Sequence, residues 1–145
     1  MTTTPPIKKR ITDICLRHDI ADLYVFGSRS TEIADLLNDK TVLPSQVASD
    51  VDIGVLPAKT ETWGPEKRVK LSLEMEDFFQ VGRVDLVLLP EADPYLALDV
   101  IRGELLYTND PDRQARYELF VLRRAGDLLP YKKGRTRMIL EEGAQ

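Results

Sequence analysis

Hydrophobic residues follow two different spacings along this chain, and the changes between them divide it into helices and strands. Apolar residues three or four positions apart predict amphipathic helices, whereas short apolar runs bounded by glycine, proline or aspartate predict strands. Helical spacing covers residues 7–17, 30–37, 66–81, 94–102 and 111 to about 129. Strand-like runs cover residues 22–26, 51–56, 83–89 and 104–108.

Start and stop signals support these boundaries. Asp93-Pro94 and Asp110-Pro111 each combine an N-cap aspartate with a proline suited to the first helical position. Gly82 and Gly103 are expected to end the helices that precede them. Residues 38–49 have no regular spacing and contain a proline, which predicts a loop.

Two of the predicted helices carry clear apolar positions. Those of 66–81 are Val69, Leu73, Phe78 and Phe79, and those of the last helix are Leu119, Phe120 and Leu122. The last helix also has four arginines, which we expect on a solvated face, with partner binding as the alternative: Arg113, Arg116, Arg123 and Arg124.

The order of the elements indicates the fold class. Strands alternate with helices, without an internal repeat or a low-complexity linker, over a length of 145 residues. This is typical of one α+β or α/β domain in which helices flank a small mixed sheet. We therefore expect a single domain over residues 1–145, with a C-terminal helix and a basic tail from about residue 110.

Carboxylates interrupt two of the apolar strands. Asp50 and Asp52 lie at alternate positions of the second strand, so they share one face, and Asp85 lies in the third strand. Aspartate is depleted from strands, and carboxylates that converge favour a hard divalent cation such as Mg²⁺ or Mn²⁺. The alternatives are a solvated edge strand for Asp50 and Asp52, and an exposed strand start after a turn for Asp85.

A second candidate motif is Gly27-Ser28, which directly follows the first strand. A glycine there lets the backbone approach a phosphate, and the amides that open the next helix attract anions. A plain turn is the alternative. The chain has neither the P-loop pattern nor the Rossmann glycine pattern.

Charge and composition narrow the class of protein. The net charge of −4 argues against a general binder of duplex nucleic acid. One cysteine and one histidine, Cys15 and His18, exclude a zinc finger and fit a reduced, cytoplasmic protein. The apolar runs are too short to span a bilayer, so we expect no membrane helix.

The combined order of motifs is more specific than any one of them. A strand, Gly27-Ser28, a helix, Asp50-x-Asp52 on a strand and Asp85 on a later strand resemble the nucleotidyltransferase superfamily with the DNA polymerase β-like fold. The resemblance is to its minimal nucleotidyltransferases and covers the chain from the first helix to the strand at 104–108. It implies that Gly27, Ser28 and Arg29 bind the triphosphate of ATP. It also implies that Asp50, Asp52 and Asp85 are catalytic and hold Mg²⁺ or Mn²⁺.

The same resemblance implies a biological role. Minimal nucleotidyltransferases typically pair with a HEPN-domain RNase toxin, which they inactivate by moving AMP from ATP onto a tyrosine. The chain would then be the antitoxin, forming a hetero-oligomer with its toxin. Two alternatives remain: a module that neutralises its partner by docking alone, and a small-molecule nucleotidyltransferase of the antibiotic-modifying type. The spacer Thr31–Ser49 is nearly twice the family's usual length, which leaves the acceptor side of the site undefined.

Overall fold

The computed structural model describes residues 7–27, 50–60 and 62–126. The predicted helix at 30–37, the loop at 38–49, the basic tail and two candidate site residues, Ser28 and Arg29, lie outside these ranges.

The described elements follow the predicted order. The helices are α1 (Ile7–Arg17), α3 (Pro65–Phe79), α4 (Pro94–Ile101) and a C-terminal helix over 111–126, and a 3₁₀ turn covers Leu89–Glu91. The strands are β1 (Ile20–Phe26), β2 (Val51–Pro57), β3 (Val84–Leu88) and β4 (Glu104–Thr108). They form a four-stranded sheet in the order β3-β2-β1-β4. β1 pairs antiparallel with β2 and β4, whereas β2 and β3 are parallel, so the sheet is mixed as predicted.

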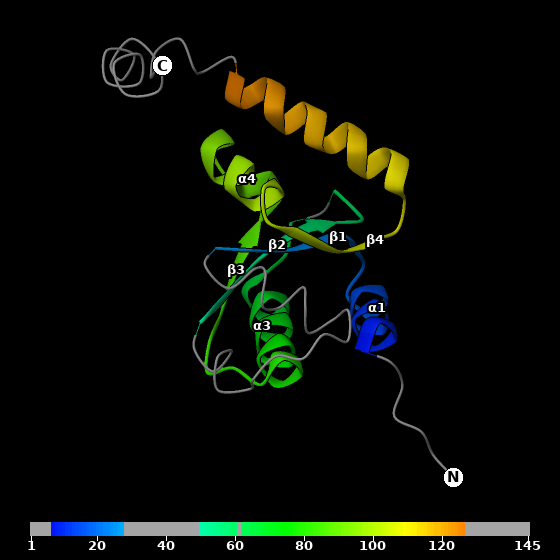
Figure 1. Ribbon diagram of the computed structural model, residues 1–145. Helices are drawn as coiled ribbons and strands as arrows, with labels where there is room; N and C mark the ends of the chain where they lie inside the picture. Colours follow the sequence, from blue (N-terminus) through cyan, green and yellow to red (C-terminus); the bar gives the residue numbers. More distant parts are fainter. Residues whose placement is uncertain (1–6, 28–49, 61, 127–145) are drawn as a thin grey trace.

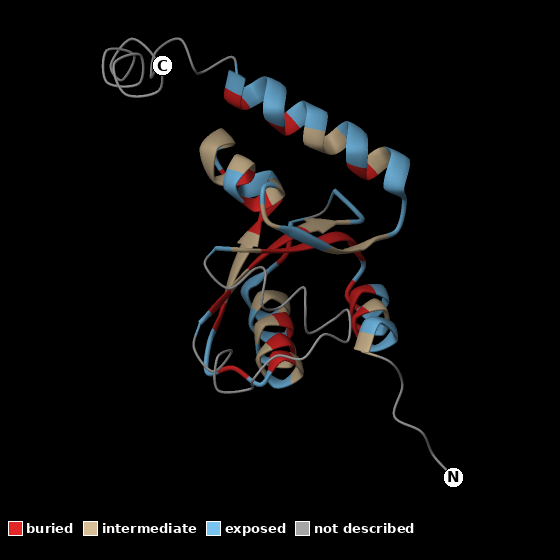
Figure 2. Ribbon diagram, in the orientation of Figure 1, coloured by how far each residue is buried: buried red, intermediate tan, exposed pale blue. Residues whose placement is uncertain are grey.

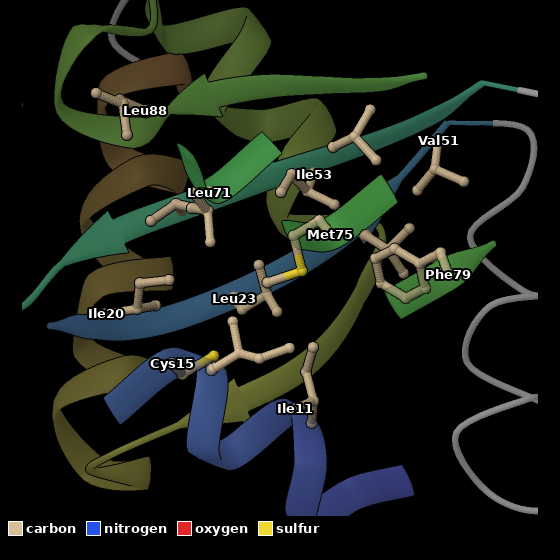
Figure 3. Close-up of a cluster of buried hydrophobic side chains, with 14 of the residues drawn as sticks. Ile11, Cys15, Ile20, Leu23, Val51, Ile53, Leu71, Met75, Phe79 and Leu88 are labelled. Atoms are coloured by element: carbon tan, nitrogen blue, oxygen red, sulfur yellow. The ribbon is translucent and has the colours of Figure 1, made fainter. Parts of the chain in front are cut away.

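Helices cover both faces of the sheet, and the sides that face it are buried (Figures 1 and 2). α1 and α3 pack on one face through Ile11, Cys15, Leu71 and Met75, which surround Leu23 of β1 (Figure 3). His18 follows α1 and joins it to α3, since its Nε2 atom lies 2.9 Å from Oε2 of Glu74. This face is a continuous apolar core.

The opposite face carries α4 and the helix at 111–126 (Figure 1). Tyr24, Val100 and Val121 form its buried centre. Gly54 of β2 allows the close approach of α4, because a Cβ at this position would overlap the Val100 side chain. Residues of β2 alternate between the two faces, so Asp52, two positions before Gly54, lies on the α4 face.

The predicted end of α3 is wrong, and its predicted apolar side is right only at Phe78 and Phe79. The helix ends at Phe79, and Gln80 adopts the left-handed conformation with φ of 58°, two residues before the expected Gly82. Its buried residues are Leu71, Met75 and Phe79, whereas Val69 and Leu73 are 57% and 58% exposed. Two apolar stripes run along this helix, and the sequence pattern alone favours neither.

The helix at 111–126 begins as predicted but turns a different side inward. Oδ1 of Asp110 accepts hydrogen bonds from the backbone N–H groups of Asp112 and Arg113, which is an N-cap arrangement. Its fully buried residues are Gln114, Val121 and Ala125. The expected apolar side, Leu119, Phe120 and Leu122, is exposed instead. None of the helices in the described ranges is both long enough and apolar enough to cross a membrane.

Candidate active site

The strand register brings two of the predicted carboxylates together. Asp52 of β2 pairs with Asp85 of β3 on one side and with Phe26 of β1 on the other. Paired residues on neighbouring strands project from the same face, so the Asp52 and Asp85 side chains meet. β2 lies inside the sheet rather than at its edge, which excludes the solvated edge strand. Asp85 is the second residue of the edge strand β3 and its side chain is 42% exposed, which fits the predicted exposed strand start, but the register also sets it opposite Asp52.

The proximity of the two carboxylates changes the protonation of Asp52. The pKa of Asp52 is raised by burial first, then by the negative charge of Asp85, a hydrogen bond between the two side chains, and the charge of Asp50. Burial and like charge both disfavour the ionised carboxylate. The site therefore holds a destabilising concentration of negative charge on a half-buried part of the sheet.

Arg83 partly offsets this charge and was not among the predicted site residues. Its Nε atom donates to Oδ1 of Asp85 over 2.9 Å, and its charge opposes the upward shift in the pKa of Asp52. Its side chain is 67% exposed, so the pair with Asp85 is a surface ion pair and a weak one. The signal was present in the sequence, because residues 83 and 85 share a face of one strand.

Gly27 follows β1 and closes over the pair. Its φ is +83°, a conformation that residues with a Cβ rarely adopt. A Cβ at this position would lie 2.7 Å from Oδ2 of Asp52. The glycine is therefore required by both its backbone conformation and its contact with the Asp52 carboxylate.

The third acidic residue is placed differently. Asp50 precedes β2 and is exposed, although its charge still acts on Asp52. Within residues 7–27, 50–60 and 62–126, no three acidic, histidine or cysteine side chains gather as a ready metal site. Mg²⁺ is commonly held by one or two carboxylates together with substrate phosphates, so the oxygen donors of Asp52 and Asp85 fit such an ion.

Comparison with known proteins identifies a family that covers the candidate site. The family described as polymerase beta, nucleotidyltransferase matches residues 9–112, which include the carboxylate pair, Asp50 and Gly27. No curated protein matches the chain.

Several solved structures share the fold. A toxin–antitoxin structure with AMP-PNP is 20% identical, with a TM-score of 0.58, and the match covers 95% of this chain and 98% of the other. A structure of the tri-AMPylated Shewanella oneidensis HEPN toxin in complex with its MNT antitoxin is 20% identical, with a TM-score of 0.56 over 96% and 97% of the two chains. An MntA–HepT toxin–antitoxin structure matches over the same shares at 19% identity, with a TM-score of 0.56. At these identities the likeness is one of fold.

Proposed function

The chain belongs to the polymerase beta nucleotidyltransferase family, and from this premise we propose that it is the antitoxin of a HEPN toxin pair and transfers AMP from ATP to a tyrosine of the toxin. The observation that carries the proposal is the pair of Asp52 and Asp85, gathered across β2 and β3 beside the Gly27 turn. Apolar strands have no structural need for such a pair, and its like charges oppose folding. Among the matched structures, one contains AMP-PNP and another an AMPylated HEPN toxin, which supports ATP as the nucleotide and the toxin as the acceptor protein.

The proposed reaction is a substitution at the α-phosphorus of ATP. The phenolic oxygen of the toxin's tyrosine forms a bond to that phosphorus, and the bond to the oxygen bridging to the β-phosphate breaks. Pyrophosphate leaves, and Asp85 orients the phenol and accepts its proton. Positioning and charge neutralisation supply most of the rate in reactions of this kind.

The chain's own residues divide the remaining tasks. Asp50, Asp52 and Asp85 would hold Mg²⁺ or Mn²⁺, which when bound supplies positive charge to the phosphate oxygens. Gly27, Ser28 and Arg29 would bind the departing phosphates, with Gly27 providing the open backbone beside Asp52. Arg83 donates a hydrogen bond to Asp85 through its Nε–H group.

ATP binding is expected to require a divalent cation. Without one, the triphosphate would face Asp52 and Asp85 unshielded, at a place where burial and the charge of Asp85 already raise the pKa of Asp52. Calorimetric titration of ATP should therefore give binding in Mg²⁺ and none in EDTA. The Asp52→Asn variant, which carries one negative charge less, should lose part of this difference. Equal affinity of the wild type in Mg²⁺ and EDTA would contradict the proposed metal role.

Covalent transfer can be separated from docking by what remains after the antitoxin is removed. A HEPN toxin incubated with the chain and Mg²⁺-ATP should gain the mass of AMP on a tyrosine and stay inactive as an RNase. Intact-mass spectrometry followed by peptide mapping measures this. The matched control is Asp52→Asn, which keeps the fold and the partner surface.

A docking antitoxin would give a different result. Inhibition by wild type and by Asp52→Asn would then be equal, independent of ATP and reversed on separation, and the toxin would keep its mass. That result would show that the chain acts as a binding module and not as a transferase. AMP transfer to a small-molecule acceptor with an unmodified toxin would favour the antibiotic-modifying type instead.

A further inference from the structure

The helix at 111–126 has two sides that would each suit an apolar neighbour. Its inner side packs on the sheet and α4 through Val121 and Ala125. Its outer side carries Leu119 and Leu122, which are 51% and 48% exposed. Figure 2 shows this helix as the outermost element on its face of the sheet, with its exposed side turned away from the domain.

The exposed residues form a regular stripe. Ala115, Leu119 and Leu122 are spaced i, i+4 and i+7, which places them along one line of the helix. This is the spacing of a helix that packs against another helix, with positions 119 and 122 as a and d of a heptad. Phe120 lies off this line, and the Cζ atom of Arg124 lies 5.5 Å from the centre of its ring. We call Ala115, Leu119 and Leu122 the outer stripe.

Two arginines flank the outer stripe on one side. Arg116 and Arg123 each follow a stripe residue by one position, which is the e position of the heptad, and both are exposed. The opposite flank faces the chain's own domain, because Ala125 is buried and Glu118 accepts a hydrogen bond from the Tyr24 hydroxyl over 2.8 Å. A helix docked on the stripe therefore meets positive charge on its open side, and carboxylates would complement it.

A second copy of this chain does not fit the stripe. In an antiparallel pair of helices, the e positions face each other, which would set Arg116 and Arg123 against the same arginines of the copy. In a parallel pair, e faces g, and the g positions, Glu118 and Ala125, are engaged in the chain's own domain. Both arrangements leave the arginines without a counter-charge, so the occupant must be a different helix.

We propose that the outer stripe docks an amphipathic helix of the HEPN-domain toxin, with apolar residues over Leu119 and Leu122 and carboxylates facing Arg116 and Arg123. The identity of the partner rests on the proposed function, whereas the surface rests on the exposed stripe and its basic flank. The stripe-bearing helix and Asp52 lie on the same face of the sheet, so a toxin held there is close to the side that presents the carboxylate pair. Docking thereby raises the effective concentration of the acceptor tyrosine.

The test compares surface variants of the full chain in binding to the HEPN toxin, measured by calorimetry at two salt concentrations. Leu119→Ser/Leu122→Ser should weaken binding about tenfold or more, as removal of central apolar contacts does. Arg116→Glu/Arg123→Glu should weaken binding and reverse its salt dependence. Phe120→Ser is the matched control, since Phe120 is 49% exposed on the same helix but outside the stripe, and should bind within about threefold of wild type. Melting curves establish that all variants fold.

The outcomes separate this inference from the proposed function. Asp52→Asn should bind the toxin as wild type does and fail to modify it, whereas the stripe variants should lose binding and keep Mg²⁺-ATP affinity. Stripe variants that bind like wild type, or a control that loses as much affinity as they do, would overturn the inference and leave the transferase intact. A wild-type dimer in solution that the stripe variants abolish would assign the surface to a second copy and overturn it as well. A toxin that binds no version, wild type included, would overturn the proposed function itself.

Discussion

Asp52→Asn should reduce AMP transfer on the order of 10³-fold, because Asp52 lies at the centre of the site between Asp85 and the Gly27 turn. An amide oxygen is a neutral ligand, so the variant lacks the negative charge of the carboxylate that attracts a hard cation. Transfer of labelled AMP at saturating ATP measures the loss. Asp99→Asn, an exposed aspartate of α4, is the matched control and should retain full activity.

The same substitution should stabilise the metal-free protein at neutral pH. Because the folded state raises the pKa of Asp52, it binds the proton more tightly than the unfolded state does. Stability is therefore highest when Asp52 is protonated and falls as the pH rises through its raised pKa. Asp52→Asn removes this loss, so its advantage in melting temperature should be present at neutral pH and shrink in acid. A variant that is less stable at neutral pH, or as active as wild type, would contradict the assigned role.

The strands and their order along the chain were readable from the sequence because the strong signals are local. Asp93-Pro94 caps α4 through two backbone N–H groups, as its residue types predict. The alternation along β2 also held for Asp52, which lies on the opposite face from the buried Val51 and Ile53. The ends of the elements were less accurate, and Gln80 ends α3 in a conformation that the pattern assigned to Gly82.

The buried sides of α3 and of the helix at 111–126 could not be predicted in the same way. α3 carries apolar residues on two stripes, and the choice between Leu71 and Leu73 depends on where the sheet lies. The helix at 111–126 shows the same ambiguity, and here the exposed stripe carries larger apolar residues than the buried one. Hydrophobicity alone therefore selects the wrong side when a helix has both a core and an outer surface suited to a partner.

The candidate site was predictable only in part, because the sequence does not show which strands are neighbours in the sheet. The sequence named Asp52, Asp85 and Gly27, but their meeting depends on β2 lying between β1 and β3, which only the topology provides. Asp50, expected beside Asp52, is exposed at the strand's start. Arg83 was missed because a lone arginine at a strand end is usually solvated. Ser28 and Arg29 remain predictions.

Arg113 departs from the solvated face predicted for the arginines of the C-terminal helix, whereas Arg116, Arg123 and Arg124 are exposed as predicted. Arg113 is not on a solvated face, since its two terminal nitrogens donate to Asp22 of β1 over 2.6 and 2.8 Å. Asp22 is fully buried, and hydrogen bonding to it raises the pKa of Arg113. Gln114 and Glu118 add bonds to the hydroxyl of Tyr24, also on β1. A polar network thus fastens this helix to the centre of the sheet.

Arg113→Ala should destabilise the protein by about 3–5 kcal/mol, because it leaves Asp22 buried and uncompensated. Arg113→Lys should destabilise the protein less than Arg113→Ala but leave it less stable than wild type, since an ammonium cannot make the bidentate contact with the Asp22 carboxylate. The double variant Asp22→Leu/Arg113→Met removes both charges. Its free energy of unfolding should be closer to that of wild type than when only one of the two charges is removed. Denaturant unfolding measures each free energy.

Arg116→Ala provides the control for that series, because Arg116 is exposed three residues along the same helix and should change stability by less than about 0.5 kcal/mol. If Arg113→Ala were equally mild, the bond to Asp22 would not be what holds the helix. If instead it unfolds the helix from the sheet, toxin binding should fall with it, since the outer stripe is presented only by a helix whose inner side is fixed. Loss of stability and loss of docking would then share one cause, distinguishable from the Leu119→Ser/Leu122→Ser variant, which should lose docking alone.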